Sequence, residues 1–230
     1  MPGAADADGT LLLARRVARR YGRLVALRPT TLAVRPGDAL ALIGPNGAGK
    51  STLLSILAGA LEPSDGDVIA GGDHVAPPKV GWVPQRPAQY GRLTARENLE
   101  LFARLEGVEE AQGAASRLLA LVELPDDERP AAHLSAGNQQ RLNLAIALLG
   151  SPRVLLLDEP TASLDPRQRR RFWEAASRVH EGGGAVVFAT QNLEELERFA
   201  SRVAVLLDGE LVFEGSVAEF ARAPQADVFA

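Results

Sequence analysis

The stretch GPNGAGKS, residues 44–51, places three glycines, a lysine and a serine at the spacing that binds phosphate groups. It follows the apolar run ALALI and opens a helical pattern, which is the strand–loop–helix setting such a loop requires. Glycine lets the backbone curl close to an anion, and the lysine brings a positive charge to the outer phosphates. The serine hydroxyl can ligate Mg²⁺, and Thr52 can donate to an inner phosphate. The predicted nucleotide-binding residues are Gly44, Asn46, Gly47, Gly49, Lys50, Ser51 and Thr52.

The stretch RVLLLDEP, residues 153–160, has the pattern of a buried strand that ends in two carboxylates. Four consecutive apolar residues indicate a strand covered on both faces, so Asp158 lies where ligands of parallel α/β sheets bind. Asp158 can hold Mg²⁺ through water, and Glu159 can orient or deprotonate the water that attacks a γ-phosphate. Two solvated loop acids are the alternative, and the phosphate loop makes it the weaker one. Together the two stretches predict hydrolysis of a nucleoside triphosphate.

Length and composition exclude several other classes of protein. The chain of 230 residues fits one large domain, and its net charge of -4 argues against a general nucleic-acid binder. There is no cysteine for a disulfide framework or a thiolate metal site. Apolar runs fall short of the roughly 18 to 20 residues that span a bilayer, and the acidic start MPGAADADGT is unlike a secretory signal. We therefore expect a cytoplasmic protein whose membrane role needs a partner.

Short apolar runs alternate with helical segments, which predicts an α/β domain with a mainly parallel sheet. The pair Asp208 and Gly209 between two apolar runs predicts a hairpin. The expected strands are 11–17, 25–34, 39–43, 67–70, 80–83, 153–157, 185–190, 202–207 and 210–214. The expected helices are 49–58, 95–106, 110–123, one from Ser135 to 150, one from Asp165 to 182, and 193–200, the last capped by Asn192 with Glu195.

Two short basic runs could be mistaken for a polyanion-binding surface. They are RRVARR at 15–20 and RQRRR at 167–171. Short charge runs are usually solvated faces, and we expect that of both.

The stretch LSAGNQQR, residues 134–141, stands just before the acidic strand and after a helical segment. It resembles the signature motif, usually LSGGQ, of the ATP-binding cassette (ABC) ATPases. Further motifs resemble that family in the right order: YG at 21–22 the aromatic loop, Gln85 the Q-loop, SLD at 163–165 the D-loop, and 190–192 the switch-histidine loop. The resemblance covers about residues 11 to 220.

This resemblance implies a P-loop NTPase with a mainly parallel central sheet, an N-terminal antiparallel β subdomain and an inserted α-helical subdomain. We expect residues 1–10 to be a flexible N-terminus and 11–230 to be a single ABC ATPase domain. Its RecA-like core would comprise about 11–88 and 151–220, and its helical subdomain about 94–150.

The resemblance also assigns roles to single residues. It implies that Tyr21 stacks on adenine and that Gln85 reaches the metal and the attacking water and links to the membrane partner. It makes Glu159 and Gln191 catalytic residues beside the γ-phosphate, and Asp165 the D-loop aspartate. Ser51, Gln85 and Asp158 are then the expected metal contacts.

The signature helix is expected to serve a second subunit. Ser135 caps a helix whose free amides and positive dipole end form an anion site without a positive side chain. One subunit has no phosphate to place there. The family pairs two cassettes head to tail, so Ser135, Gly137 and Asn138 of one subunit would contact the γ-phosphate held by the other. ATP then joins the pair, and hydrolysis lets it open.

Two departures from the family pattern bear on turnover. The signature has Ala136 and Asn138 where the family usually has glycine and glutamine. Gln191 stands where the family normally has histidine, and its amide can donate a hydrogen bond but cannot carry a proton or a charge. We therefore expect a slow ATPase.

The resemblance implies an integral-membrane permease subunit that docks on residues 86–105, and a second cassette. The chain would then lie on the inner face of the cell membrane through that permease. The general pattern looks most like cassettes of ABC-2-type exporters for drugs, lipids or polysaccharides. Three alternatives stay open: an importer cassette, a soluble ABC protein of translation or DNA repair, and a catalytically weak partner in a heterodimeric pair.

Overall fold

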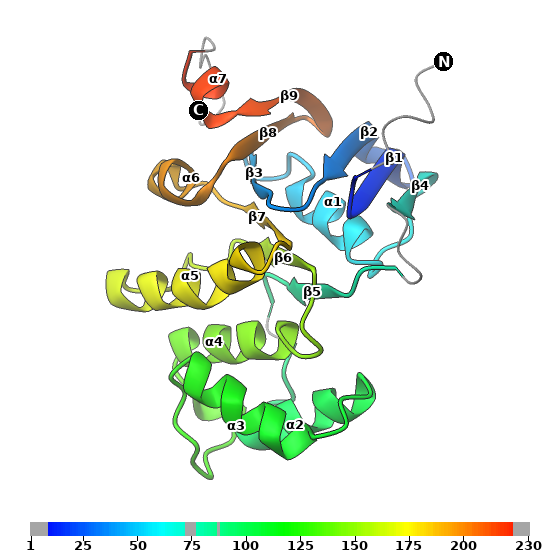
Figure 1. The fold of residues 1–230 in the computed structure, drawn as a ribbon. Coiled ribbons are helices and arrows are strands. Elements are labelled where there is room, and N and C mark those ends of the chain that lie inside the picture. Colours follow the sequence, from blue (N-terminus) through cyan, green and yellow to red (C-terminus); the bar gives the residue numbers. More distant parts are fainter. Residues whose placement is uncertain (1–8, 72–76, 87, 223–230) are drawn as a thin grey trace.

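The computed structural model describes residues 9–71, 77–86 and 88–222, and most of the predicted flexible N-terminus lies outside them. Two sheets and a group of helices make up this part of the chain (Figure 1). The strands are β1 (Leu12–Tyr21), β2 (Leu24–Val34), β3 (Ala39–Ile43), β4 (Asp65–Ala70), β5 (Val80–Val83), β6 (Val154–Asp158), β7 (Ala185–Ala189), β8 (Arg202–Leu207) and β9 (Glu210–Ser216). The helices are α1 (Lys50–Leu57), α2 (Ala95–Leu105), α3 (Ala111–Leu121), the 3₁₀ turn Ala131–His133, α4 (Ala136–Ala147), α5 (Pro166–Glu181), α6 (Leu193–Phe199) and α7 (Val217–Arg222).

The central sheet has the order β5-β6-β7-β3-β8-β9, and all neighbours are parallel except the β8–β9 hairpin. Alternate side chains of a strand point to opposite faces. Leu40 and Leu42 of β3 accordingly join the core with α1 and the N-terminal strands, whereas Ala41 and Ile43 join the core with α4 and α5. Because both faces are covered, the strands are nearly continuous apolar runs, as the sequence predicts.

The N-terminal strands form a separate antiparallel sheet with the order β2-β1-β4. The amide of Arg28 on β2 donates to the carbonyl of Gly209 in the β8–β9 turn at 2.7 Å. The two sheets are thus joined beside α1, and the predicted fold class is confirmed: a mainly parallel sheet, an antiparallel N-terminal sheet and helices.

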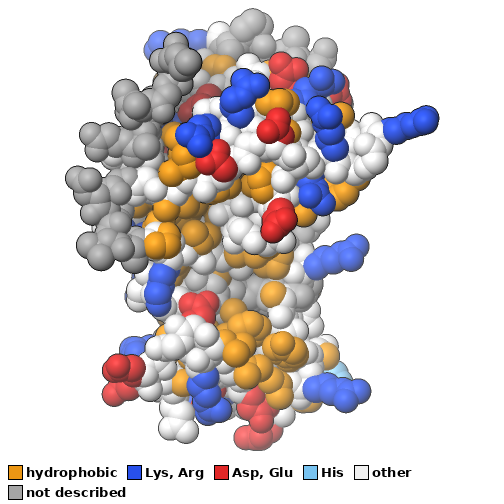
Figure 2. Space-filling view, turned by 90° about the vertical axis from the view of Figure 1, so that its right-hand side faces the viewer, with side chains coloured by type: hydrophobic (Ala, Val, Ile, Leu, Met, Phe, Trp, Pro, Cys, Tyr) orange, Lys and Arg blue, Asp and Glu red, His pale blue; other side chains and the backbone are white. Residues whose placement is uncertain are grey.

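Helices α2, α3 and α4 lie between β5 and β6 in the sequence and pack together at one end of the molecule (Figure 1). Helix α2 begins with a capping box, in which the Thr94 hydroxyl accepts from the Glu97 amide and the Glu97 carboxylate accepts from the Thr94 amide. Figure 2 shows hydrophobic side chains gathered on this helical end. Large exposed hydrophobic side chains in this part of the chain include Tyr90 and Leu105.

Every strand and helix expected from the sequence is present, with differences at the ends. Strand β1 extends four residues beyond its predicted end at Val17, because a left-handed residue at Arg16 (φ 51°) interrupts the alternation and lets the strand continue. The short helix α7 and the 3₁₀ turn were not predicted. Within the described ranges, no helix has the length and apolar character needed to cross a bilayer.

Candidate active site

The predicted phosphate loop connects β3 to α1, and its glycines are required by the chain itself. Gly44 has φ 144°, and a Cβ atom there would lie 2.0 Å from the Leu206 carbonyl oxygen. At Gly49, with φ 100°, a Cβ would lie 2.7 Å from the carbonyl oxygen of Ala26. Gly47 (φ 81°) has open space around that position among the described residues, so only its backbone conformation calls for glycine. Gly44 and Gly49 are therefore needed because neighbouring backbone passes close to them, and not only to make room for a ligand.

Helix α1 opens toward this loop with free backbone donors. Its N-cap is Gly49, which has no side chain that could accept a hydrogen bond from the amides of the first turn. The amides of the first helical turn have no partner within a helix, so those of Lys50, Ser51 and Thr52 are available to an anion. This arrangement fits the phosphates of a nucleotide.

Lys50 lies folded back over the loop. Its side chain is 5 % exposed, and its Nζ donates to the carbonyl oxygens of Gly44 at 2.7 Å and Pro45 at 2.9 Å. Burial lowers the pKa of Lys50, and the nearby carboxylates of Glu159 and Asp158 oppose that shift. The Lys50 ammonium group is thus held by two carbonyl oxygens of the phosphate loop, where a bound phosphate would lie close to it.

Ser51 and Asp158 form the pair expected to contact Mg²⁺. The Ser51 hydroxyl donates to Asp158 Oδ1 at 3.0 Å, and burial raises the pKa of that carboxyl group. Hydroxyl and carboxylate oxygens are hard donors, which suit Mg²⁺. The described residues contain no group of three or more acidic, histidine or cysteine side chains that would cage a metal alone. Mg²⁺ keeps water and phosphate ligands in such sites, so the donor set fits a nucleotide-bound ion.

Two amide side chains converge on the Glu159 carboxylate, and a third amide, that of Asn46, contacts one of them. Gln191 Nε2 donates to Glu159 Oε1 at 2.9 Å and to Asn46 Oδ1 in the phosphate loop at 2.7 Å. Gln85 Nε2 lies 3.4 Å from the other oxygen, Glu159 Oε2. Glu159 itself has φ 47°, and its amide donates to the carbonyl of Ala189 at the end of β7. The ends of β5, β6 and β7 and the phosphate loop therefore meet at one carboxylate.

The signature residues lie at the start of α4, where the Ser135 hydroxyl accepts from the Asn138 amide at 3.3 Å. The Asn138 side-chain oxygen accepts a hydrogen bond from Arg141, a buried arginine that also binds the carbonyls of Val122 and Glu123. A Cβ at Gly137 would lie 2.5 Å from the amide oxygen of Gln168. The expected cap is present, and each of its contacts is made within this chain.

Asp165 and Tyr21 also have partners in the chain. Asp165 caps α5 in a capping box with Gln168, its carboxylate accepting from the Gln168 amide at 2.8 Å. Tyr21 is 48 % exposed at the end of β1, and the Arg19 guanidinium lies 4.7 Å from its ring centre. An exposed ring that already stacks with a cation on one side leaves its other side for an aromatic ligand.

Two readings of the sequence near this site are wrong. Glu195 does not complete a capping box with Asn192: its buried carboxylate accepts hydrogen bonds from the hydroxyls of Thr161 and Thr190. The basic run 167–171 is not wholly a solvated face either, because Arg169 Nε lies 3.5 Å from Glu195 Oε1. In both cases a tertiary contact determines where the side chain lies, and such a contact gives no local pattern in the sequence.

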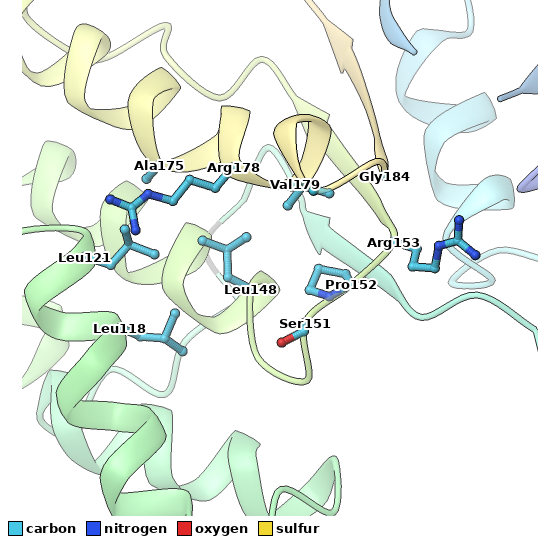
Figure 3. A pocket seen from close by; sticks show the side chains of 11 residues that line it. Leu118, Leu121, Leu148, Ser151, Pro152, Arg153, Ala175, Arg178, Val179 and Gly184 are labelled. Carbon is cyan, nitrogen blue, oxygen red and sulfur yellow. The ribbon is translucent and has the colours of Figure 1, made fainter. Parts of the chain in front are cut away.

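Another cavity lies away from these residues. It has a volume of about 370 Å³ and separates α3 from the carboxyl end of α5 (Figure 3). Leu118, Leu121 and Leu148 form its apolar side, with Arg178 reaching across it. It contains none of the predicted site residues. A second cavity of about 320 Å³ borders Glu159 and Gln191 and is the one beside the predicted chemistry.

The fold and this loop define a P-loop nucleotide-binding protein. A family model described as ABC transporter matches residues 27–162. The linearmycin resistance ATP-binding protein of Bacillus subtilis is 31 % identical over 90 % of this chain and 69 % of its own length. The chain therefore belongs to the ABC transporter family, as the sequence motifs predict. Members of this family bind ATP and are generally ATPases.

Two further comparisons give the extent of the likeness. The mouse ATP-binding cassette sub-family A member 7 is 38 % identical over 93 % of this chain, which spans only 10 % of that protein's length. A solved dimeric ATP-binding cassette, in a post-hydrolysis state bound to ADP and Pi, is 29 % identical with a TM-score of 0.78. That likeness covers 89 % of this chain and 98 % of the solved one.

Proposed function

We propose that this chain is the ATP-hydrolysing subunit of an exporter: it binds Mg–ATP, pairs head to tail with a second cassette, and powers a separate membrane permease. The observation that carries the catalytic part is the Gln191 amide, which binds both Glu159 and Asn46. It holds the Glu159 carboxylate at the edge of the phosphate loop, where a general base for attacking water is needed. No nucleic acid has a part in this cycle.

The remaining residues bind and orient the nucleotide. Lys50 and the first amides of α1 hold the phosphates, and Tyr21 stacks on the adenine ring. Ser51 and Asp158 hold Mg²⁺, with Gln85 approaching it from β5. When bound, the metal neutralises charge that develops on the phosphate oxygens.

The relatives support the pairing and the direction of transport. The similar solved cassette is a dimer bound to ADP and Pi, and a dimer is what Ser135, Gly137 and Asn138 need to meet a phosphate held by another subunit. Asp165, in the D-loop, would lie at the same contact. Export of a toxic compound confers resistance to it, so the name of the Bacillus subtilis relative supports export. The permease would hold the chain at the inner face of the membrane.

A second candidate function rests on the departures from the family pattern. Gln191 and the altered signature favour a nucleotide-binding partner with weak catalysis, paired with a more complete cassette. A neutral amide donates to the γ-phosphate but supplies no charge. The hydrogen bond of Gln191 to Glu159 favours the first function, because it keeps the base in place.

The decisive experiment measures ATP hydrolysis by the purified chain with Mg²⁺ or EDTA, in parallel with the Glu159→Gln variant. We expect hydrolysis that needs Mg²⁺ and that falls by about a hundredfold or more in the variant, because it loses a general base. The variant should still bind ATP and elute as a dimer in gel filtration with ATP.

Glu197→Gln is the matched control, since Glu197 is an exposed glutamate of α6. It should hydrolyse ATP at the unmodified rate. Equal rates in Glu159→Gln and the unmodified chain would refute the catalytic assignment. ATP binding without measurable hydrolysis by the unmodified chain would favour the second function, and a mixture with a partner cassette would then restore turnover.

A further inference from the structure

Glu195 is a buried carboxylate that the nucleotide site does not contact directly. It lies in α6, its side chain is 3 % exposed, and its neighbours Glu194 and Glu197 on the same helix are exposed. Glu195 Oε2 accepts a hydrogen bond from the Thr190 hydroxyl at 2.8 Å, and Oε1 accepts one from Thr161. A buried charge is costly unless it is paired and hydrogen-bonded. Its presence here needs an explanation.

The partners of Glu195 belong to the segments that carry the predicted catalytic groups. Thr190 immediately precedes Gln191 at the end of β7. Thr161 follows Glu159 by two residues at the end of β6. One carboxylate therefore joins the backbone that carries the base to the backbone that carries its amide partner.

Arg169 brings a third segment to the same carboxylate. Its Nε lies 3.5 Å from Glu195 Oε1, and its amide donates to the carbonyl of Asp165 at the start of α5. The D-loop helix is thereby connected to Glu195 as well. Thr190 has a further contact, because its hydroxyl accepts from the Asn192 amide at 3.0 Å. The contacts of Glu195 thus involve the first turns of both α5 and α6.

The side chains of Glu159 and Gln191 receive little support from packing. Gln191 is exposed and Glu159 half-buried. Both border the cavity of about 320 Å³, and the remaining lining residues are Thr161, Ala162, Arg169, Thr190, Asn192 and Glu195. Because a cavity lies beside them, their positions depend on the backbone from which they extend. Glu195 binds the hydroxyls of Thr161 and Thr190, which follow β6 and β7 respectively.

We propose that Glu195 is a positioning residue, which holds the Glu159–Gln191 pair in register through Thr161 and Thr190. The role rests on the proposed ATP hydrolysis. It predicts that loss of Glu195 misplaces the base without removing any group that binds the nucleotide. Small misplacements of reacting groups lower turnover strongly.

The kinetic test compares Glu195→Ala with Glu197→Ala. We expect Glu195→Ala to lower kcat about tenfold or more with KM for ATP nearly unchanged, as misplacement of a base predicts. Glu197→Ala should leave both constants unchanged. In a Gln191→Ala background the effect of Glu195→Ala should largely disappear, because the pair is already broken.

A second pair of variants guards against loss of folding in Glu195→Ala. Thr161→Val removes one hydroxyl that binds Glu195 at nearly constant volume, and Thr161→Ser retains it. The valine variant should lower kcat, and the serine variant should retain it. An unchanged kcat in both Glu195→Ala and Thr161→Val would overturn the proposal.

A readout independent of turnover separates this proposal from the proposed function. The side-chain amide of Gln191 gives two ¹⁵N–¹H NMR signals, assigned by their loss in Gln191→Ala. We expect these signals to shift in Glu195→Ala and to stay in place in Glu197→Ala. Unshifted signals would contradict the positioning role. If the unmodified chain hydrolysed no ATP but the signals shifted, only the proposed function would fail.

Discussion

Two faces of this chain are built in opposite ways. The phosphate-loop face comprises residues 44–52 with Asp158, Glu159 and Gln191, and the signature face comprises residues 135–138 at the start of α4. On the first, Ser51 reaches Asp158 across 107 positions of the sequence, and Gln191 reaches Asn46 across 145. On the second, Ser135 binds the amide of Asn138, and Asn138 binds Arg141, three residues away in each case. One face is assembled by the whole fold, and the other chiefly by the first turn of a single helix.

This difference indicates what each face can do alone. The phosphate-loop face brings a cation, hard oxygen donors and a carboxylate together, so under the proposed function it binds and activates a nucleotide within one chain. The signature face offers helix amides, the Ser135 hydroxyl and the Asn138 side chain, whose oxygen is bound by Arg141. Under the proposed function it contributes only when a second subunit presents a phosphate. Variants should therefore separate binding from hydrolysis according to the face they change.

The largest effect on binding is expected at Lys50. In Lys50→Ala the affinity for ATP should fall about ten- to a hundredfold, since hydrogen bonds to charged groups contribute about 1.5 to 3 kcal/mol. Titration with a fluorescent ATP analogue measures this. Lys79→Ala is the matched control, because Lys79 is an exposed lysine outside the predicted site. Equal affinities in the two variants would mean that the phosphate-loop face is not the nucleotide site.

A smaller effect, restricted to hydrolysis, is expected at Ser135. Loss of a helix N-cap costs about 1 kcal/mol, which corresponds to roughly a fivefold change in rate if the cap orients donors toward a phosphate. Ser135→Ala should lower the ATPase rate by about that factor while single-chain affinity for ATP stays constant. Thr94→Ala removes the equivalent N-cap of α2 and is the control. It should lower the melting temperature as loss of the Ser135 cap does, but it should leave the ATPase rate unchanged. A reduced affinity in Ser135→Ala would show that the two faces are not independent.

Gln191→His sharpens the account of the phosphate-loop face. Histidine donates as glutamine does and can also carry a charge, so the rate at neutral pH should stay the same or rise by up to about tenfold. Imidazole has an ordinary pKa of about 6.5, so the ratio of variant to unmodified rates should change between about pH 6 and pH 7. Steady-state rates across that range measure it. A large fall at every pH would mean that residue 191 does not face the phosphate.

The smallest effect is a stability change at Asp158. Burial raises the pKa of Asp158 above its ordinary value of 3.8, so the folded chain binds that proton more tightly than the unfolded chain. The folded state is therefore destabilised as the pH rises. This destabilisation is absent below pH 3.8 and complete once the pH exceeds the pKa of Asp158 in the folded chain. Asp158→Asn should therefore melt a few degrees higher at pH 7 without nucleotide, by an amount that shrinks as the pH is lowered. Calorimetry at several pH values checks this, and a lower melting temperature at pH 7 would contradict it.

The sequence predicts where several groups of the phosphate-loop face lie in the fold, because they stand at the ends of recognisable strands. Asp158 and Glu159 follow a run of buried residues, and Gln191 follows another. Carboxyl ends of parallel strands meet at one edge of a sheet, so their proximity follows from the fold class. The hydrogen bond of Gln191 to Asn46 adds a detail that the motif order alone does not contain.

The groups behind this face could not be predicted in the same way. Glu195 lies three residues after a capping Asn192, so a local rule assigned it to the helix start. One of its two hydroxyl partners, Thr161, is 34 residues away, and a tertiary contact of that kind leaves no local pattern. Arg169 was assigned to solvent for the same reason: a run of arginines gives no sign of which one faces inward.

The contact between Gly44 and Leu206 also has a consequence for synthesis of the chain. Ribosomes make the phosphate loop before β8, yet the carbonyl against which Gly44 rests belongs to Leu206 of β8. A nascent chain released before β8 carries every residue of the loop and lacks one of its walls. The proposed nucleotide site is thus incomplete until β8 has been made and has packed against the loop, so under the proposed function ATP binding reports on the folding of both segments.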